Sequence, residues 1–105
     1  MIRIKEGVDI AGLRPEILLV LPVAESILKE MSWSVNIVIT SGRDGKHSIG
    51  SFHYNGLAID LRTREMEPGQ IPHFVQHMKT CLGVQFDVVL EDTHLHIEFQ
   101  PKGTA

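Results

Sequence analysis

The chain has 105 residues, which is enough for one domain built around a single hydrophobic core. Its hydrophobic content of 43% is that of a globular protein and excludes an intrinsically disordered chain. A net charge of −3 gives no electrostatic basis for binding nucleic acid or an anionic membrane, so neither is expected as a partner.

The composition and the N-terminal half also bear on location. The single cysteine, Cys81, excludes an intramolecular disulfide, and we expect it to be a small buried residue. An apolar run at 17–23 is too short to span a bilayer and contains Pro22. It begins after acidic residues and too far along the chain to be a signal peptide. We therefore expect a chain that is cytoplasmic as synthesised, and we also expect a monomer.

The first half of the chain predicts a strand, a helix and a second strand. Residues 2–5 alternate between apolar and polar, which is typical of a short strand. A proline in the first turn and apolar residues at helical spacing predict a helix over 15–31. Pro22 lies inside this range and should kink the helix or split it in two. The β-branched run at 35–40 predicts a buried strand, and a polar loop follows over 41–50.

The second half predicts a strand, a helix and a hairpin. A short strand is expected at 57–61, followed by a helix over 70–82 that ends at a glycine. Residues 84–90 and 94–99 both have strand character, and the turn-like residues between them favour a hairpin. Helices and short strands in this order indicate an α+β domain in which the helices pack on one antiparallel sheet.

One segment carries the strongest chemical signal. Residues 51–60 read Ser-Phe-His-Tyr-Asn-Gly-Leu-Ala-Ile-Asp, so His53 and Asp60 supply an imidazole and a carboxylate seven residues apart. About 35 residues later, His94 and His96 offer a second imidazole from a predicted strand, where both side chains share one face. Two nitrogens and one oxygen are the ligands of an open catalytic zinc site, whose fourth position is left to water.

Segment 51–60 fits the pattern S-x-H-x-x-G-x-A-x-D at every fixed position. In this it resembles the zinc peptidases that include the D-Ala-D-Ala carboxypeptidases, the vancomycin-resistance dipeptidases and the phage L-alanyl-D-glutamate endolysins; the hedgehog signalling domain shares their fold. The resemblance covers about residues 35–100. It implies a hedgehog/DD-peptidase-like fold and Zn²⁺ held by His53, Asp60 and His96, because in relatives with an H-x-H element the later histidine is the ligand. His94 would then line the cleft.

A zinc peptidase also needs a carboxylate that is not a ligand, to accept a proton from the metal-bound water. Glu91 and Asp92 stand in the predicted turn before His94, and either could serve, with Glu91 favoured. In some relatives the acidic residue stands three positions before the last ligand. Thr93 occupies that position relative to His96, whereas Glu91 occupies it relative to His94. The assignments of the base and of the last ligand therefore depend on each other.

The loop before the motif contributes three further candidates. The resemblance implies that Arg43 holds a carboxylate or carbonyl of the substrate, for which a planar guanidinium is suited. Residues 44–48 resemble the hedgehog stretch that brings a further histidine to the zinc cleft, so His47 is a candidate for stabilising an oxyanion. Ser51 is expected to hydrogen-bond around the site, to a ligand or to the substrate.

A second histidine pair does not fit a metal site. His73 and His77 are four residues apart on a predicted helix, as in the H-E-x-x-H zinc enzymes. The intervening residues include no glutamate, so a partly exposed helix face is the better interpretation.

The candidate ligands predict a minimal zinc metallopeptidase. The resemblance implies that it hydrolyses short peptidoglycan stem peptides, as a carboxypeptidase, dipeptidase or endolysin, and that it acts on the cell wall after release. The alternative is a zinc-stabilised binding domain without catalysis, in the way the hedgehog domain uses this fold. The two differ in whether Glu91 or Asp92 faces the open position of the metal.

Overall fold

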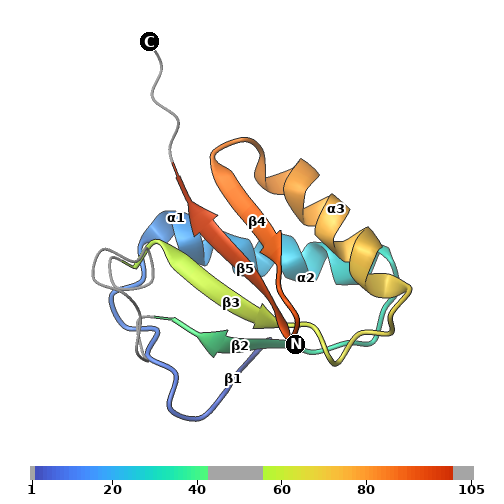
Figure 1. The fold of residues 1–105 in the computed structure, drawn as a ribbon, viewed down its shortest axis with the longest axis horizontal. Helices are drawn as coiled ribbons and strands as arrows, with labels where there is room; N and C mark the ends of the chain where they lie inside the picture. Colours follow the sequence, from blue (N-terminus) through green and yellow to red (C-terminus); the bar gives the residue numbers. More distant parts are fainter. Residues whose placement is uncertain (1, 43–55, 101–105) are drawn as a thin grey trace.

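A computed structural model describes residues 2–42 and 56–100 and shows an α+β fold (Figure 1). The helices and the strands alternate irregularly along the chain, and all strands of the described part belong to one sheet. In chain order the elements are β1 (Ile2–Ile4), α1 (Pro15–Leu18), α2 (Val20–Glu30), β2 (Ile37–Ser41), β3 (Ala58–Arg62), α3 (Gln70–Leu82), β4 (Phe86–Leu90) and β5 (His94–Phe99).

The sheet is mixed, which corrects the prediction of a purely antiparallel one. Its strand order is β1-β2-β3-β5-β4, and β1 runs parallel to β2 while the other neighbours are antiparallel. The chain leaves β1 and passes through α1 and α2 before it enters β2, and such a crossover brings the second strand back in the same direction. The predicted β4–β5 hairpin is confirmed, and the Glu91 N–H donates to the His94 carbonyl oxygen across it at 2.9 Å.

The predicted long helix is split, but at Leu19 rather than at Pro22. Pro22 is the third residue of α2, where backbone N–H groups have no partner within the helix and a proline costs little. An uninterrupted helix would press the proline ring against the carbonyl of Leu18, four residues earlier. The break therefore falls at Leu19, three residues before the proline, and α2 begins at Val20. The prediction of α3 is confirmed over 70–82, and Gly83 ends that helix with a φ of +83°.

One face of the sheet builds the core. Alternate residues of the two central strands, Ile59 and Leu61 of β3 and Leu95 and Ile97 of β5, are buried against helix residues. In Figure 1, α1 and α2 cross behind the sheet, and α3 runs beside β4. The residues between the buried ones point to the other side of the sheet, which we call the open face; it carries Asp60, His94, His96 and Glu98.

The helices bear on two further expectations, the burial of Cys81 and the lack of a membrane-spanning segment. Cys81 is exposed, so the prediction that it is buried was wrong. Helix α3 buries Phe74 and Met78, and Leu82 continues this row with a spacing of four while Cys81 stays beside it in solvent. In the described ranges, no helix has both the length and the apolar character needed to cross a bilayer.

Candidate metal centre

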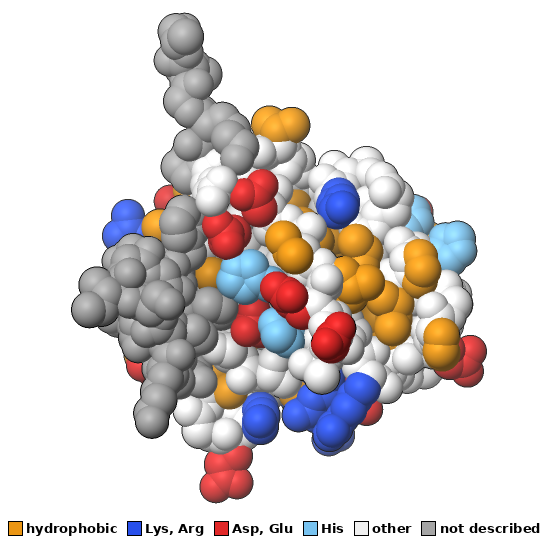
Figure 2. All heavy atoms as spheres, in the orientation of Figure 1, with side chains coloured by type: hydrophobic (Ala, Val, Ile, Leu, Met, Phe, Trp, Pro, Cys, Tyr) orange, Lys and Arg blue, Asp and Glu red, His pale blue; other side chains and the backbone are white. Residues whose placement is uncertain are grey.

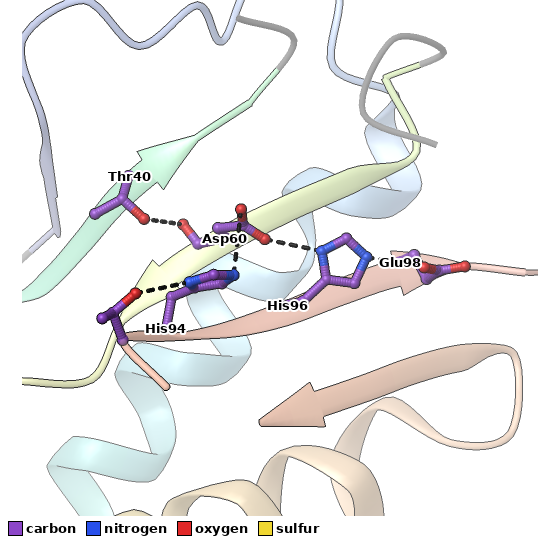
Figure 3. Close-up of polar contacts among 6 residues, drawn as sticks. Thr40, Asp60, His94, His96 and Glu98 are labelled. Carbon is purple, nitrogen blue, oxygen red and sulfur yellow. Dashed lines mark hydrogen bonds and ion pairs between the residues drawn. The ribbon is translucent and has the colours of Figure 1, made fainter. Parts of the chain in front are cut away.

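The two central strands bring the candidate ligands together. Asp60 of β3 and His96 of β5 are register partners in the antiparallel pair, and His94 precedes His96 by two residues on the same strand. Because residues two apart share one face of a sheet, all three side chains lie on the open face. Figure 3 shows both imidazoles turned toward the Asp60 carboxylate, and Figure 2 shows histidine and acidic side chains together near the middle of this face.

His96 lies between two carboxylates. Its Nδ1 is 2.8 Å from Oδ1 of Asp60, and its Nε2 is 2.8 Å from Oε1 of Glu98. Gln100 donates in turn to Oε2 of Glu98 at 2.7 Å and so fixes that carboxylate. Asp60 is only 8% exposed, and a carboxylate so withdrawn from water requires partners of this kind.

This arrangement holds a proton on His96 in the metal-free protein. Ionised carboxylates only accept hydrogen bonds, so both ring nitrogens must donate, and both do so only in the imidazolium form. The hydrogen bond that His96 donates to Asp60 raises the pKa of His96 to about 9; burial acts in the opposite direction, and Glu98 adds to the rise. The two carboxylates therefore form a site for a cation, which in the metal-free protein is a proton.

His94 is the second imidazole within reach of Asp60. Its Nε2 lies 3.7 Å from Oδ2 of Asp60, and its Nδ1 lies 3.1 Å from Oγ1 of Thr93. On the other side of β3, the Thr40 hydroxyl donates to the backbone carbonyl of Asp60 at 3.5 Å. The carboxylate is thus approached by an imidazole on each of its two oxygens, while its backbone is tied to β2.

Two residues of the 51–60 motif have clear structural roles. Gly56 has a φ of +74°, and a β-carbon there would collide with the carbonyl oxygen of Gly12. Its own carbonyl accepts a hydrogen bond from Arg14 N–H at 2.9 Å. Ala58 is fully buried at the start of β3. The backbone conformation and the close contact at position 56 therefore require glycine, and the buried Ala58 anchors the strand that carries Asp60.

The other predicted residues divide into two groups. Glu91 and Asp92 lie exposed in the turn between β4 and β5; Glu91 follows Val89 by two residues and bonds to the backbone of His94. The remaining candidates lie outside the described residues: Arg43, His47, Ser51 and His53. Accordingly, within residues 2–42 and 56–100 no group of three or more His, Cys, Asp or Glu side chains could hold a metal ion.

The described donors nevertheless fit zinc. Ligand atoms of a tetrahedral zinc lie about 3.3 Å apart, given bonds of about 2.0–2.1 Å. The separation of 2.8 Å between His96 and Asp60 and that of 3.7 Å between His94 and Asp60 lie on either side of this value. Distance alone does not choose between the histidines. Glu98 favours His96, because a metal-binding histidine usually donates its other ring N–H to a carboxylate.

The segment His96-Ile97-Glu98 resembles the H-x-D/E element that often follows the ligand histidine in related peptidases, which supported His96 but gave Glu98 no role of its own. In the structure, Glu98 contacts the candidate ligand directly. The available signal was its position two residues after His96 on a predicted strand, which places both on one face. Comparison with protein-family models finds none that matches the chain, and comparison with curated proteins finds no match either. The case for a function therefore rests on the sequence pattern and on the geometry of the open face.

Proposed function

We propose that the protein is a zinc-dependent peptidase of the D-Ala-D-Ala carboxypeptidase type, in which His53, Asp60 and His96 hold the metal. One observation carries the proposal: Asp60 and His96 are register partners on the open face, with donor atoms 2.8 Å apart. The 51–60 motif adds His53 to this pair and connects it with the zinc peptidases that the sequence resembles. Short peptides of bacterial peptidoglycan are the proposed substrates, because those enzymes cleave them.

The roles of the surrounding residues follow from their chemistry. Zinc, when bound, polarises a carbonyl and lowers the pKa of its water to about 7. Glu98 keeps its hydrogen bond with Nε2 of His96 and so presents Nδ1 on the side of Asp60. Thr93 positions the ring of His94 through its hydroxyl. The open face lets an extended peptide lie across both strands.

Glu91 is the proposed general base. It follows Val89, the register partner of His96, by two residues and comes directly after the end of β4, so the alternation of that strand, if continued, would put its side chain on the open face. Its N–H bonds to His94, so its backbone stays next to the candidate ligands. A carboxylate in this position accepts a proton from the attacking water and returns it to the leaving amine, a contribution of about 10²–10⁴-fold in rate.

A second candidate function is a zinc-stabilised binding domain without catalysis. Among the described residues, the side chains of Glu91 and Asp92 make no hydrogen bond or ion pair, whereas Glu98 is fully engaged by His96 and Gln100. The cation site of the open face is thus formed without either turn residue, as a purely structural metal site would be.

The test is incubation of the zinc-loaded protein with purified muropeptides, with the products identified by mass spectrometry. The peptidase predicts hydrolysis of one peptide bond, which is lost after chelation and in Asp60→Asn. Glu91→Gln should keep its zinc and lose activity. Stoichiometric zinc with no cleavage of any muropeptide would favour the binding domain instead.

A further inference from the structure

A basic pocket adjoins the candidate metal centre where β3 ends. Arg62 of β3 is the register partner of His94, and Thr93, whose hydroxyl contacts His94, also lines this pocket. The pocket and the metal centre therefore share a wall. Its volume is about 480 Å³, and the lining residues that matter here are Lys5, Arg62, Thr63, Arg64, Asp92 and Thr93.

The pocket has an excess of positive charge. Three cationic side chains line it, from Lys5, Arg62 and Arg64, against the single carboxylate of Asp92. Glu65 is shared by both arginines, at 3.3 Å from Arg62 and 3.6 Å from Arg64. In the part of the chain that the structure describes, Lys5 has no ion-pair partner. The positive charge of Lys5 is therefore not balanced by a carboxylate among the described residues, and it is available to an anion that enters the pocket.

Arg62 is held in place for such an anion. Its side chain is 19% exposed, whereas that of Arg64 is 74% exposed, so Arg62 forms part of the wall and Arg64 stands at the mouth. A guanidinium fixed in this way presents a planar fork of donors, which matches the two oxygens of a carboxylate.

Charge is distributed unevenly along the β3–β5 pair of the open face, with an acidic residue at one end and a basic residue at the other. Glu98 lies opposite Ala58 at one end of the β3–β5 pair, and Arg62 lies opposite His94 at the other. Figure 2 shows Lys and Arg side chains below the central histidines, with acidic side chains above and beside them. A peptide lying along these strands is therefore favoured when its carboxylate points toward Arg62 and disfavoured when it points toward Glu98.

We propose that this basic pocket binds a carboxylate of the peptide substrate, close to the bond that is cleaved; the inference rests on the proposed peptidase function. Arg62 follows Asp60 by two residues, which is about 7 Å along a strand. Because an extended peptide spans about 3.3–3.6 Å per residue, the carboxylate belongs to the first or second residue beyond that bond. Arg43, predicted to contact the substrate, is a separate residue outside the described ranges.

The experiment uses the zinc-loaded full chain and three acetylated peptides of equal length. One ends in a free carboxylate, one in an amide, and one in an amide with a glutamate as its last residue. Binding is followed by NMR through the backbone amides of Thr63 and Thr93, and cleavage by kcat/KM. The variants are Lys5→Gln and Arg62→Gln, and Lys29→Gln on α2 is the matched control, since Lys29 lines a different cavity.

The wild-type protein should bind a carboxylate peptide on the order of tenfold or more tightly than the plain amide, because hydrogen bonds to charged groups are the strong ones. Tighter binding of the peptide with a free C-terminus would identify the bound group as a terminal carboxylate. Tighter binding of the amidated peptide that ends in glutamate would identify it as a side-chain carboxylate. Lys5→Gln and Arg62→Gln should lose the preference, and Lys29→Gln should keep it. Lys5→Gln alone decides the matter if Arg62→Gln fails to fold.

Other outcomes overturn the inference. Equal binding of acid and amide, or an acid preference that survives Lys5→Gln, would show that the pocket is not a carboxylate site. Inorganic phosphate binding more tightly than either acid would make it a phosphate site. Cleavage of acid and amide with equal kcat/KM would leave the peptidase standing without this subsite. An acid preference in a protein that cleaves nothing would leave the subsite standing and remove the peptidase.

Discussion

Zinc binding should displace a proton from His96, and its pH dependence can be worked out in advance. In the metal-free protein, Asp60 and Glu98 each accept a hydrogen bond from the ring at 2.8 Å, and the pKa of His96 is raised to about 9. A histidine binds zinc only as neutral imidazole, so the metal competes directly with this proton. Zinc affinity should therefore keep rising with pH well above neutrality.

The size of the effect follows from the raised pKa. A solution at pH 7 lies about two pH units below the pKa of His96, so only about one molecule in a hundred carries the neutral ring at that pH. The affinity at pH 7 should be about 100-fold below its limit and should rise about tenfold per pH unit toward pH 9. A ligand histidine of ordinary pKa, about 6.5, would reach its limit near pH 7.5.

The assay is a competition with a chelator of known affinity between about pH 6 and 8.5, combined with calorimetry in buffers of different ionisation enthalpy to count released protons. Glu98→Gln removes one of the two charges that hold the proton, so its affinity should level off at lower pH and fewer protons should be released at pH 7.5. Glu65→Gln removes a carboxylate that contacts Arg62 instead, and it should behave as wild type. A wild-type profile that levels off near pH 7, or identical profiles for the two variants, would refute the reasoning.

Three further predictions follow from the same site. The metal-free protein should lose stability as pH rises from about 6.5 through 9, because a raised pKa stabilises only the protonated fold; the melting temperature of His96→Gln should lack this slope. Metal analysis should show large zinc losses in His53→Ala and His96→Ala and none in His73→Ala, and chelation should lower the melting temperature of the wild type. Glu91→Gln should slow muropeptide cleavage by on the order of 10²-fold or more with zinc retained, whereas Asp92→Asn should do far less; the reverse ranking would exchange their roles.

Local signals were enough to predict most of the secondary structure. Helix α3 begins and ends where apolar spacing and the following glycine place it, and β5 coincides with the apolar alternation around its histidines. The parallel pairing of β1 with β2 was not predictable in this way, because it depends on how the intervening helices return the chain. The break at Leu19 was missed because the effect of Pro22 falls on the preceding turn, at the carbonyl four residues earlier.

The candidate site was predictable in its residues but not in its contacts. The motif singles out Asp60, and the H-x-H element singles out His94 and His96. That Asp60 lies opposite His96 is a consequence of strand register, which is set by the whole sheet. Glu98 and Arg62 gained their positions from the same register. The burial of Cys81 was predicted wrongly, because residue type indicates only average burial and not the side of a helix on which a residue lies.

The most direct test of the central claim is a crystal structure of the zinc-loaded protein with anomalous diffraction measured at the zinc edge. The account predicts one anomalous peak on the open face, within bonding distance of Asp60, His96 and His53, with Glu98 still bonded to the second nitrogen of His96. A peak coordinated by His94 without His96 would make His94 the last ligand, with Glu91 three residues before it. A fully zinc-loaded protein with no peak at Asp60 would contradict the account.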